Sequence, residues 1–381
     1  MELPRRQFLH LAGGATMLAT LPRTTYAQAF PSHPITMVVP VPAGGAMDTV
    51  ARIVAEGMRA SLGHPVVIEN VTGASGSIGV GRVARATPDG YMIIYGALVT
   101  HVVNAAVYQL PYDVLADFEP LALIAATPWL ICAKKDLPAN DLSGLVAWLR
   151  ANPDKASSGT AGPGSPSHIG GILFQNITST RFQLIPYRGT APVIPDLVSG
   201  TIDMAILDPV TALPQFRAGH VKVFAVTAKS RTATAPEVPT VDEAGVPGLH
   251  ISPWQAMWAP NGSPKDIIAR LNSAVVAALA DPALRTRLAE QSYAIGPREE
   301  QTPEYLGAFH RAEIARWWPI IKAANIKGGV TADARRLGCC GARCAGRAPR
   351  PRVSLAGWPP PRGGAQPGLR RLVGRQDGPD F

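Results

Sequence analysis

Between residues 30 and 330, short apolar runs alternate with amphipathic stretches. Three runs, at 35–39, 66–68 and 92–95, are nearly continuously apolar, which is typical of strands covered on both faces. Between the first two runs, apolar residues recur at helical spacing from position 50 to position 62. Strands that alternate with helices in this way predict an α/β fold with mainly parallel sheets.

Two later helices are indicated by their first residues. Ser263-Pro264 and Thr302-Pro303 each stand just before an apolar stretch of helical period. Each pair predicts a hydroxyl cap followed by proline at the first helical position. The body that contains all these elements is about 300 residues long, a length at which chains tend to form more than one domain.

Glycine-bearing loops lead from predicted strands into predicted helices at 41–48, 73–77 and 159–168. Glycine lets the backbone approach a ligand closely, and the free N–H groups of a helix N-terminus favour an anion. In an open α/β sheet, ligands bind beyond the carboxyl ends of the strands, where such loops lie. Two anion-binding loops far apart in sequence would suit a dicarboxylate held at both ends. The alternative is that the loops are only tight strand-to-helix turns.

Residues 1–29 have the pattern of an export signal. Arg5 and Arg6 precede a short apolar run, and small residues offer cleavage near Ala27 or Ala29. The run is shorter than the roughly 20 residues that a membrane-spanning helix needs. The arginine pair resembles a twin-arginine signal, with an ordinary secretory signal as the alternative. Either route predicts a mature protein in the periplasm.

The formal net charge of +9 comes from the two ends of the chain. Residues 1–27 carry +2 and residues 331–381 carry +7, so the body between them is neutral by formal count. A basic total of this origin does not indicate nucleic acid as a partner.

Residues 331–381 are rich in Arg, Gly and Pro and almost lack apolar periodicity, so we expect them to be disordered. We interpret these residues as the product of translation that continues past the normal end of the gene into an unrelated reading frame. Cys339, Cys340 and Cys344 lie in this tail without a nearby histidine, which gives a zinc site little support. Cys132 is the one cysteine of the body, and we expect it to be a buried thiol outside any disulfide.

A series of short motifs runs in order through residues 31–330. They include Pro42-Ala43-Gly44-Gly45-Ala46-Met47-Asp48, Pro88-Asp89-Gly90-Tyr91, Leu110-Pro111-Tyr112-Asp113, Gly164-Ser165-Pro166-Ser167-His168, Pro186-Tyr187-Arg188-Gly189 and Pro239-Thr240-Val241-Asp242-Glu243. In this order and over this length, the motifs resemble those of the Bug family of tripartite tricarboxylate transporter receptors. The tail at 331–381 has no counterpart in the resemblance.

The resemblance implies a periplasmic-binding fold of type II, in which two α/β lobes are joined by two crossover strands with a ligand cleft between them. It places lobe 1 at 30–131 and 254–330 and lobe 2 at 132–253. The two crossings are expected near 129–134 and 251–256. Hinge closure of the lobes would then bury the ligand.

The resemblance also implies a small carboxylate ligand, which could be a di- or tricarboxylate, an acidic amino acid or an aromatic acid. The expected ligand-binding residues are Val41, Ala43, Gly44, Gly45, Asp48, Thr100, Gly164, Ser165, Ser167, His168, Tyr187, Thr190 and Asp208. For Asp48, a capping or helix-dipole role needs no ligand, and the alternative is a contact to a ligand amine or a bridging water. His168 could likewise pack or bind. The family commonly has an aromatic residue at the position of Val41, so a pocket of different shape is expected.

The implied function is a monomeric receptor that delivers its ligand to the membrane subunits of a tripartite tricarboxylate transporter, without catalytic residues, cofactor or metal. A sensor that docks on a membrane signalling protein is the alternative with the same fold. A hydrolase that uses Ser165 with His168 has little support, because the two residues stand three apart across a helix start. The chain has no nucleophile elbow, zinc helix, phosphate-binding loop or dinucleotide motif.

Overall fold

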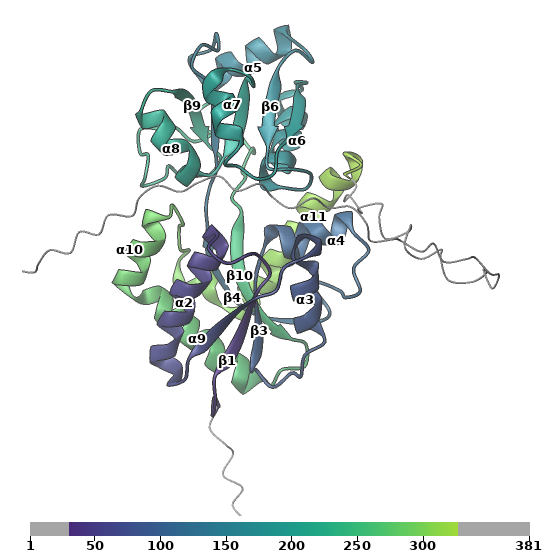
Figure 1. The fold of residues 1–381 in the computed structure, drawn as a ribbon, viewed down its shortest axis with the longest axis vertical. Helices are drawn as coiled ribbons and strands as arrows, with labels where there is room; N and C mark the ends of the chain where they lie inside the picture. The colour runs from purple at the N-terminus through teal and green to yellow at the C-terminus, as the bar shows by residue number, and fades with distance from the viewer. Residues whose placement is uncertain (1–29, 327–381) are drawn as a thin grey trace, which may run out of the picture. The chain divides into compact units, whose positions relative to one another are not determined.

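The computed structural model describes residues 30–326 of the chain. The predicted export signal at 1–29 and the basic tail at 331–381, with its three cysteines, lie outside the described residues. Over the described range the chain forms two five-stranded sheets and ten α-helices (Figure 1). The α/β class is confirmed, and the three predicted N-terminal strands are all present.

The first sheet has the strand order β2-β1-β3-β10-β4, so a strand from much later in the chain enters its middle. Its strands are β1 (Ile35–Val39), β2 (Val66–Asn70), β3 (Met92–Ala97), β4 (Phe118–Ala126) and β10 (Trp254–Pro260). Its helices are α2 (Ala46–Leu62), α3 (Ser77–Ala84), α4 (Asn104–Val107), α9 (Lys265–Ala280), α10 (Pro282–Glu290) and α11 (Pro303–Ala323), with short helical turns η2 (Ala74–Gly76), η3 (Val99–Val103) and η4 (Arg298–Gln301). In β1, Met37 packs into a core with α2, α9 and α10, whereas Val38 packs on the opposite face with α3 and α11.

The second sheet has the strand order β7-β6-β8-β5-β9. Its strands are β5 (Leu130–Lys134), β6 (Ser157–Thr160), β7 (Gln183–Pro186), β8 (Met204–Leu207) and β9 (Val221–Val226), and its helices are α5 (Leu142–Ala151), α6 (Pro166–Thr178), α7 (Val193–Ser199) and α8 (Pro209–Arg217). Alternate residues of β5 serve opposite cores: Ile131 packs with α5 and α6, while Cys132 packs with α7 and α8. Cys132 is fully buried, as expected of a core thiol, and burial raises the pKa of that thiol.

The prediction of mainly parallel sheets is only half correct. The strands β1, β2 and β3 run parallel, as do β6, β7 and β8. By contrast, β10 is antiparallel to both β3 and β4, and β5 is antiparallel to both β8 and β9. The exceptions are the strands that follow a crossing, because a chain that arrives from the other sheet enters against the direction set by the local strand–helix–strand units.

The two predicted helix starts behave differently. Thr302 caps α11 by accepting the Tyr305 N–H at 3.2 Å, and Pro303 is the first helical residue, as predicted. The capping prediction at Ser263 is wrong, because its hydroxyl donates to Pro260 O at 2.8 Å and α9 begins only at Lys265. No single helix among residues 30–326 is long and apolar enough to cross a membrane, although α9 and α10 pass that test when joined across their 73° bend.

The chain passes between the two sheets at two places, which we call the hinge segments: residues 127–129 and residues 251–253. They lie side by side, with Thr127 N donating to Pro253 O at 3.0 Å. The expected crossings begin within these segments but extend into β5 and β10. We therefore describe the molecule as a first lobe around sheet one and a second lobe around sheet two. The predicted boundaries between the two lobes, at 131/132 and at 253/254, stay a proposal.

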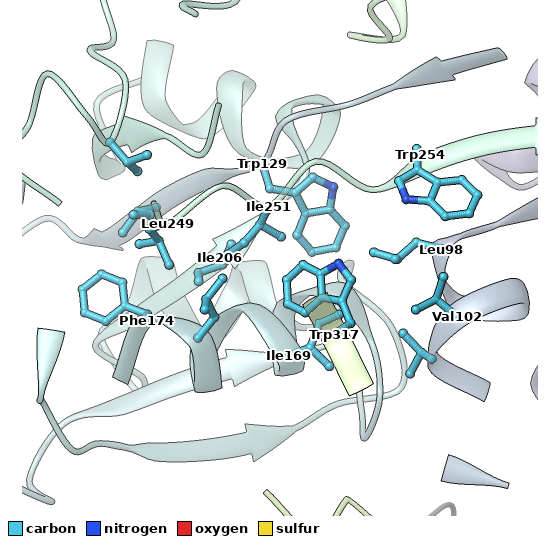
Figure 2. Close-up of a cluster of buried hydrophobic side chains, with 14 of the residues drawn as sticks. Leu98, Val102, Trp129, Ile169, Phe174, Ile206, Leu249, Ile251, Trp254 and Trp317 are labelled. Atoms are coloured by element: carbon cyan, nitrogen blue, oxygen red, sulfur yellow. The ribbon is translucent and has the colours of Figure 1, made fainter. Parts of the chain in front are cut away.

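Buried side chains hold the hinge segments together. Thr227 is fully buried, and its Oγ1 lies 2.8 Å from Trp129 O and 2.7 Å from Ile251 O. Figure 2 shows the indole rings of Trp129 and Trp317 beside Ile251, with side chains of both lobes around them. One apolar core therefore continues from the first lobe through the hinge into the second, with α11 as its shared helix.

Candidate ligand-binding site

The loop between β1 and α2 presents an open helix N-terminus. Gly45 is the N-cap residue of α2 and makes no side-chain capping bond, and residues 42–46 are exposed. Gly44 has a φ of 85°, in the left-handed region where glycine is favoured. The first N–H groups of α2 are thus available to an anion, in keeping with the expectation for this loop.

Asp48 lies behind this loop and organises it. One carboxylate oxygen accepts the Gly44 N–H and the Arg52 Nε–H, each at 2.9 Å, and the other accepts Asn70 Nδ2 at 2.9 Å. Burial by itself would raise the pKa of Asp48, but the hydrogen bonds from Arg52, Gly44 and Asn70 lower it overall. The contacts support the structural alternative for Asp48, because both oxygens already have donors within the protein. Val41 is half-buried beside them, and its carbonyl accepts a bond from Asn70.

The second glycine loop comes close to the segment after β3. Gly76 has a φ of 90°, and a side chain there would meet Pro40 O and the Thr100 Cγ2 at 3.0 Å. Thr100 is buried, and its Oγ1 accepts the Ala97 N–H at 2.9 Å and lies 3.0 Å from His101 Nδ1. Thr100 therefore packs against the loop at Gly76, and its hydroxyl is already hydrogen-bonded within the protein.

The third loop caps α6 with its own side chains. Ser165 is the N-cap residue: its Oγ accepts the His168 N–H at 3.3 Å and donates to Gly162 O at 2.6 Å. Ser167 is buried, and its Oγ accepts the Ala161 N–H at 2.8 Å.

His168 completes this loop through its ring. Its Nδ1 accepts the Gly164 N–H at 3.2 Å, and burial lowers the pKa of His168, so the ring is neutral with its proton on Nε2. The Ser165 hydroxyl donates to a backbone carbonyl, and the His168 ring serves a backbone N–H. The geometry therefore gives no support to a nucleophile and base made of these two residues.

The remaining predicted residues lie on the second lobe. Tyr187 donates to Asp196 Oδ2 at 2.6 Å, and burial together with Asp196 raises the pKa of Tyr187 to about 12. Asp208 caps α8 by accepting the Thr211 N–H at 2.9 Å and the Thr211 hydroxyl at 2.8 Å. Thr190 is half-buried, in the turn before α7.

Two of the cavities that are lined by residues of both lobes include predicted ligand-binding residues. The first, of about 310 Å³, is lined by Ala46, Thr127, Trp129, Thr190, Asp208, Val210, Thr211, Pro253, Gln291 and Tyr293. The second, of about 210 Å³, is lined by Ser75, Val99, Val103, Asn104, Val107, Tyr108, Pro163, Gly164, Ser165 and Pro166. We call them the hinge cavity and the α6 cavity. The open end of α2 reaches the hinge cavity through Ala46, whereas the N-terminus of α6 lies at the other cavity.

Four of the thirteen predicted ligand-binding residues line one of these two cavities. Thr190 and Asp208 line the hinge cavity, and Gly164 and Ser165 line the α6 cavity. The others, Val41, Ala43, Gly44, Gly45, Asp48, Thr100, Ser167, His168 and Tyr187, line neither of these two cavities. Of the latter group, Ala43, Gly44 and Gly45 are exposed next to Ala46, while several of the rest are bonded within their own loops.

Sequence reasoning missed Gln291 and Tyr293, which line the hinge cavity from the segment after α10. No motif marks them, because each is a single polar residue that the fold brings to the cleft from far along the chain. Trp129 lies in a predicted crossing between the lobes, and that position was the available signal that it could line the cleft.

Comparison with known proteins agrees with this architecture. A UPF0065 protein encoded in the TAR-I ttuE-ttuC' intergenic region of Agrobacterium vitis is 38% identical over 306 residues, which cover 80% of this chain and 88% of that protein. The solved periplasmic binding protein BugD is 37% identical, with a TM-score of 0.65, over 78% of this chain and 99% of BugD.

Two solved relatives contain ligands. MatC from Rhodopseudomonas palustris, with bound malate, is 37% identical, with a TM-score of 0.65, over 77% of this chain and all of that chain. A second R. palustris protein, with adipate, is 33% identical, with a TM-score of 0.67, over 78% of this chain and 99% of that one.

The relatives confirm the periplasmic-binding fold of two α/β lobes and two crossings. The family model described as tripartite tricarboxylate transporter family receptor matches residues 50–326, which are most of the chain. The family consists of solute-binding receptors and is not an enzyme family. The chain therefore belongs to the tripartite tricarboxylate transporter receptors, the family that includes the Bug proteins.

Proposed function

We propose that this receptor captures a small dicarboxylate between its two lobes in the periplasm and delivers it to the membrane subunits of a tripartite transporter. The observation that carries the proposal is the hinge cavity, where the uncapped N-terminus of α2 meets polar residues of the second lobe. Free backbone N–H groups at a helix N-terminus bind one carboxylate without a counter-charged side chain.

We expect one ligand with two anionic ends to extend from the hinge cavity to the α6 cavity. A volume of about 310 Å³ is at the small end of typical ligand pockets. The α6 cavity offers Ser165 and the N-terminus of α6 on the opposite lobe. A molecule that reaches both helix N-termini is satisfied at both ends only when the lobes close, so binding favours the closed state. The bound malate and adipate of the two R. palustris relatives are dicarboxylates of this kind.

Native mass spectrometry of protein purified from the periplasm without added ligand tests the proposal. The expected result is a co-purified or exchangeable small acid, displaced by malate or adipate. A nucleotide, a sugar or a metal ion as the bound species would contradict it. Recovery of multi-span transport subunits in a membrane pull-down supports delivery, whereas recovery of a signalling kinase instead would favour the sensor alternative.

A further inference from the structure

A chain of three polar side chains runs from the core of the first lobe to the hinge cavity. Tyr95 is fully buried in β3, and its hydroxyl donates to Gln255 Oε1 at 2.6 Å. Gln255, in β10, donates in turn from Nε2 to Tyr293 Oη at 2.7 Å. Tyr293 lines the hinge cavity, whereas Tyr95 and Gln255 do not.

The two hydrogen bonds determine which atom is the donor at each step between Tyr95, Gln255 and Tyr293. If the Gln255 amide were turned round, the Tyr95 hydroxyl would be a buried donor without an acceptor, which carries a large penalty. With the amide as found, Tyr293 Oη already accepts a bond, so its single proton is free to point elsewhere. Within residues 30–326, Tyr293 Oη makes no second hydrogen bond, and Tyr293 lines the hinge cavity, so its proton is available to a ligand there.

The surroundings keep Tyr293 protonated. Burial and the nearby carboxylate of Asp208 raise the pKa of Tyr293 to about 12. The hydroxyl is therefore a donor at any physiological pH. A donor that also accepts a bond from an amide is polarised by it, and this strengthens its own bond to an anion.

We propose that Tyr293 is a ligand-binding residue whose hydroxyl donates to a carboxylate of the ligand, and that Tyr95 and Gln255 are positioning residues that turn its proton toward the cavity. The inference rests on the proposed function and adds a specificity element to it. A ligand group that presents only acceptors, as a carboxylate does, fits this site better than one that presents a donor.

The experiment is a double-mutant cycle of Tyr293→Phe and Tyr95→Phe, with calorimetric binding of malate and adipate. Tyr293→Phe removes a hydrogen bond to a charged group and should weaken binding about 10- to 100-fold. Tyr95→Phe frees Gln255 Oε1, so the amide can turn and accept the Tyr293 proton. We expect a loss of about 3- to 10-fold from a residue that lies outside the cavity. The matched control is Tyr91→Phe, which removes a hydroxyl bonded to Ser32 and should leave affinity unchanged.

The decisive readout is non-additivity. Once Tyr293 is Phe, the Tyr95 change should have no further effect on affinity, because no proton remains to be directed. Thermal melts of all variants confirm that binding is measured on folded protein. If the parent binds malate or adipate and Tyr293→Phe binds it with an affinity within twofold of the parent's, this inference is overturned and the proposed function stands. Additive losses overturn the positioning role. A folded parent that binds neither acid contradicts both the inference and the proposed function.

Discussion

The Asp48 carboxylate accepts the N–H of Gly44 at 2.9 Å and so ties the first turn of α2 to the loop that precedes it. The bond holds the loop in a shape that leaves the following N–H groups of α2 open. A carboxylate next to an anion site would repel the ligand, but the Arg52 guanidinium on the same oxygen offsets that charge. An acidic residue thus organises the loop that we propose to bind an anion.

The first prediction concerns the pH dependence of stability. Because the pKa of Asp48 is lowered from its ordinary value near 3.8, its contribution to stability is fully present above about pH 4. The contribution is lost as the pH falls through the lower folded-state value. Asp48→Asn should therefore be less stable at neutral pH, and its stability should fall less steeply between about pH 4 and pH 2. Urea unfolding from neutral pH down to about pH 2 measures both effects, with the exposed Asp266→Asn on α9 as control. If the free energy of unfolding of Asp48→Asn depends on pH as steeply as that of the parent, the hydrogen bonds of Asp48 do not contribute to stability.

A second prediction separates backbone conformation from ligand access at neighbouring glycines. Gly44→Ala should destabilise the fold by about 1–2 kcal/mol, because its φ of 85° strains any side chain. Gly45 has a φ of −79°, and a side chain there would meet only Pro42 O, at 3.7 Å. Gly45→Val should therefore lose at most about 1 kcal/mol of stability, the scale of an N-cap change.

The same Gly45→Val change should weaken carboxylate binding at least tenfold, because the branched side chain keeps the ligand from the first N–H groups of α2. Thermal melts together with calorimetry separate the two effects. If Gly45→Val binds as tightly as the parent, the ligand does not approach this loop.

A third prediction concerns Ser165, whose hydroxyl is shared between helix capping and the α6 cavity. Ser165→Ala should cost about 1 kcal/mol of stability and about threefold to tenfold in affinity. Thr302→Ala removes the equivalent cap of α11 and lines neither cavity, so it should match the stability loss without the affinity loss. Equal affinity losses in the two variants would assign the effect to general destabilisation.

A fourth prediction is that removal of residues 331–381 leaves the melting temperature and ligand affinity unchanged. The family match ends at residue 326, and the removed segment lacks apolar periodicity. Differential scanning calorimetry of the full and shortened proteins measures the melting temperature, and titration calorimetry with malate and adipate measures the affinity. A fall of several degrees would show that the segment contributes to the fold.

The elements with a strong local pattern could be predicted, and those set by topology could not. The sequence predicts β1 with its observed ends, because the run is apolar except for Thr36 and a proline follows Val39. The direction of β10 was missed, since a strand's direction depends on where the chain comes from and not on its own residues. Ser263 was assigned a cap because a hydroxyl before proline is a common start, but here the hydroxyl bonds backward to Pro260.

In the candidate site, too, the parts that carry a local sequence motif could be predicted, and the parts that depend on the fold could not. Its loops at 41–48 and 159–168 carry motifs, so sequence alone drew attention to them. The contribution of Tyr293 depends on two buried partners from β3 and β10, which only the folded chain brings together. The sequence likewise does not show that the Tyr187 hydroxyl donates to Asp196 on its own lobe, and the placement of Tyr187 at the ligand stays a prediction.

The most direct test of the central claim is isothermal titration calorimetry of the folded, ligand-free protein with malate and with adipate. We expect saturable binding of at least one of them with one site per chain, accompanied by a more compact solution scattering profile as the lobes close. The absence of binding to either acid at millimolar concentration, by a protein shown to be folded, would contradict it.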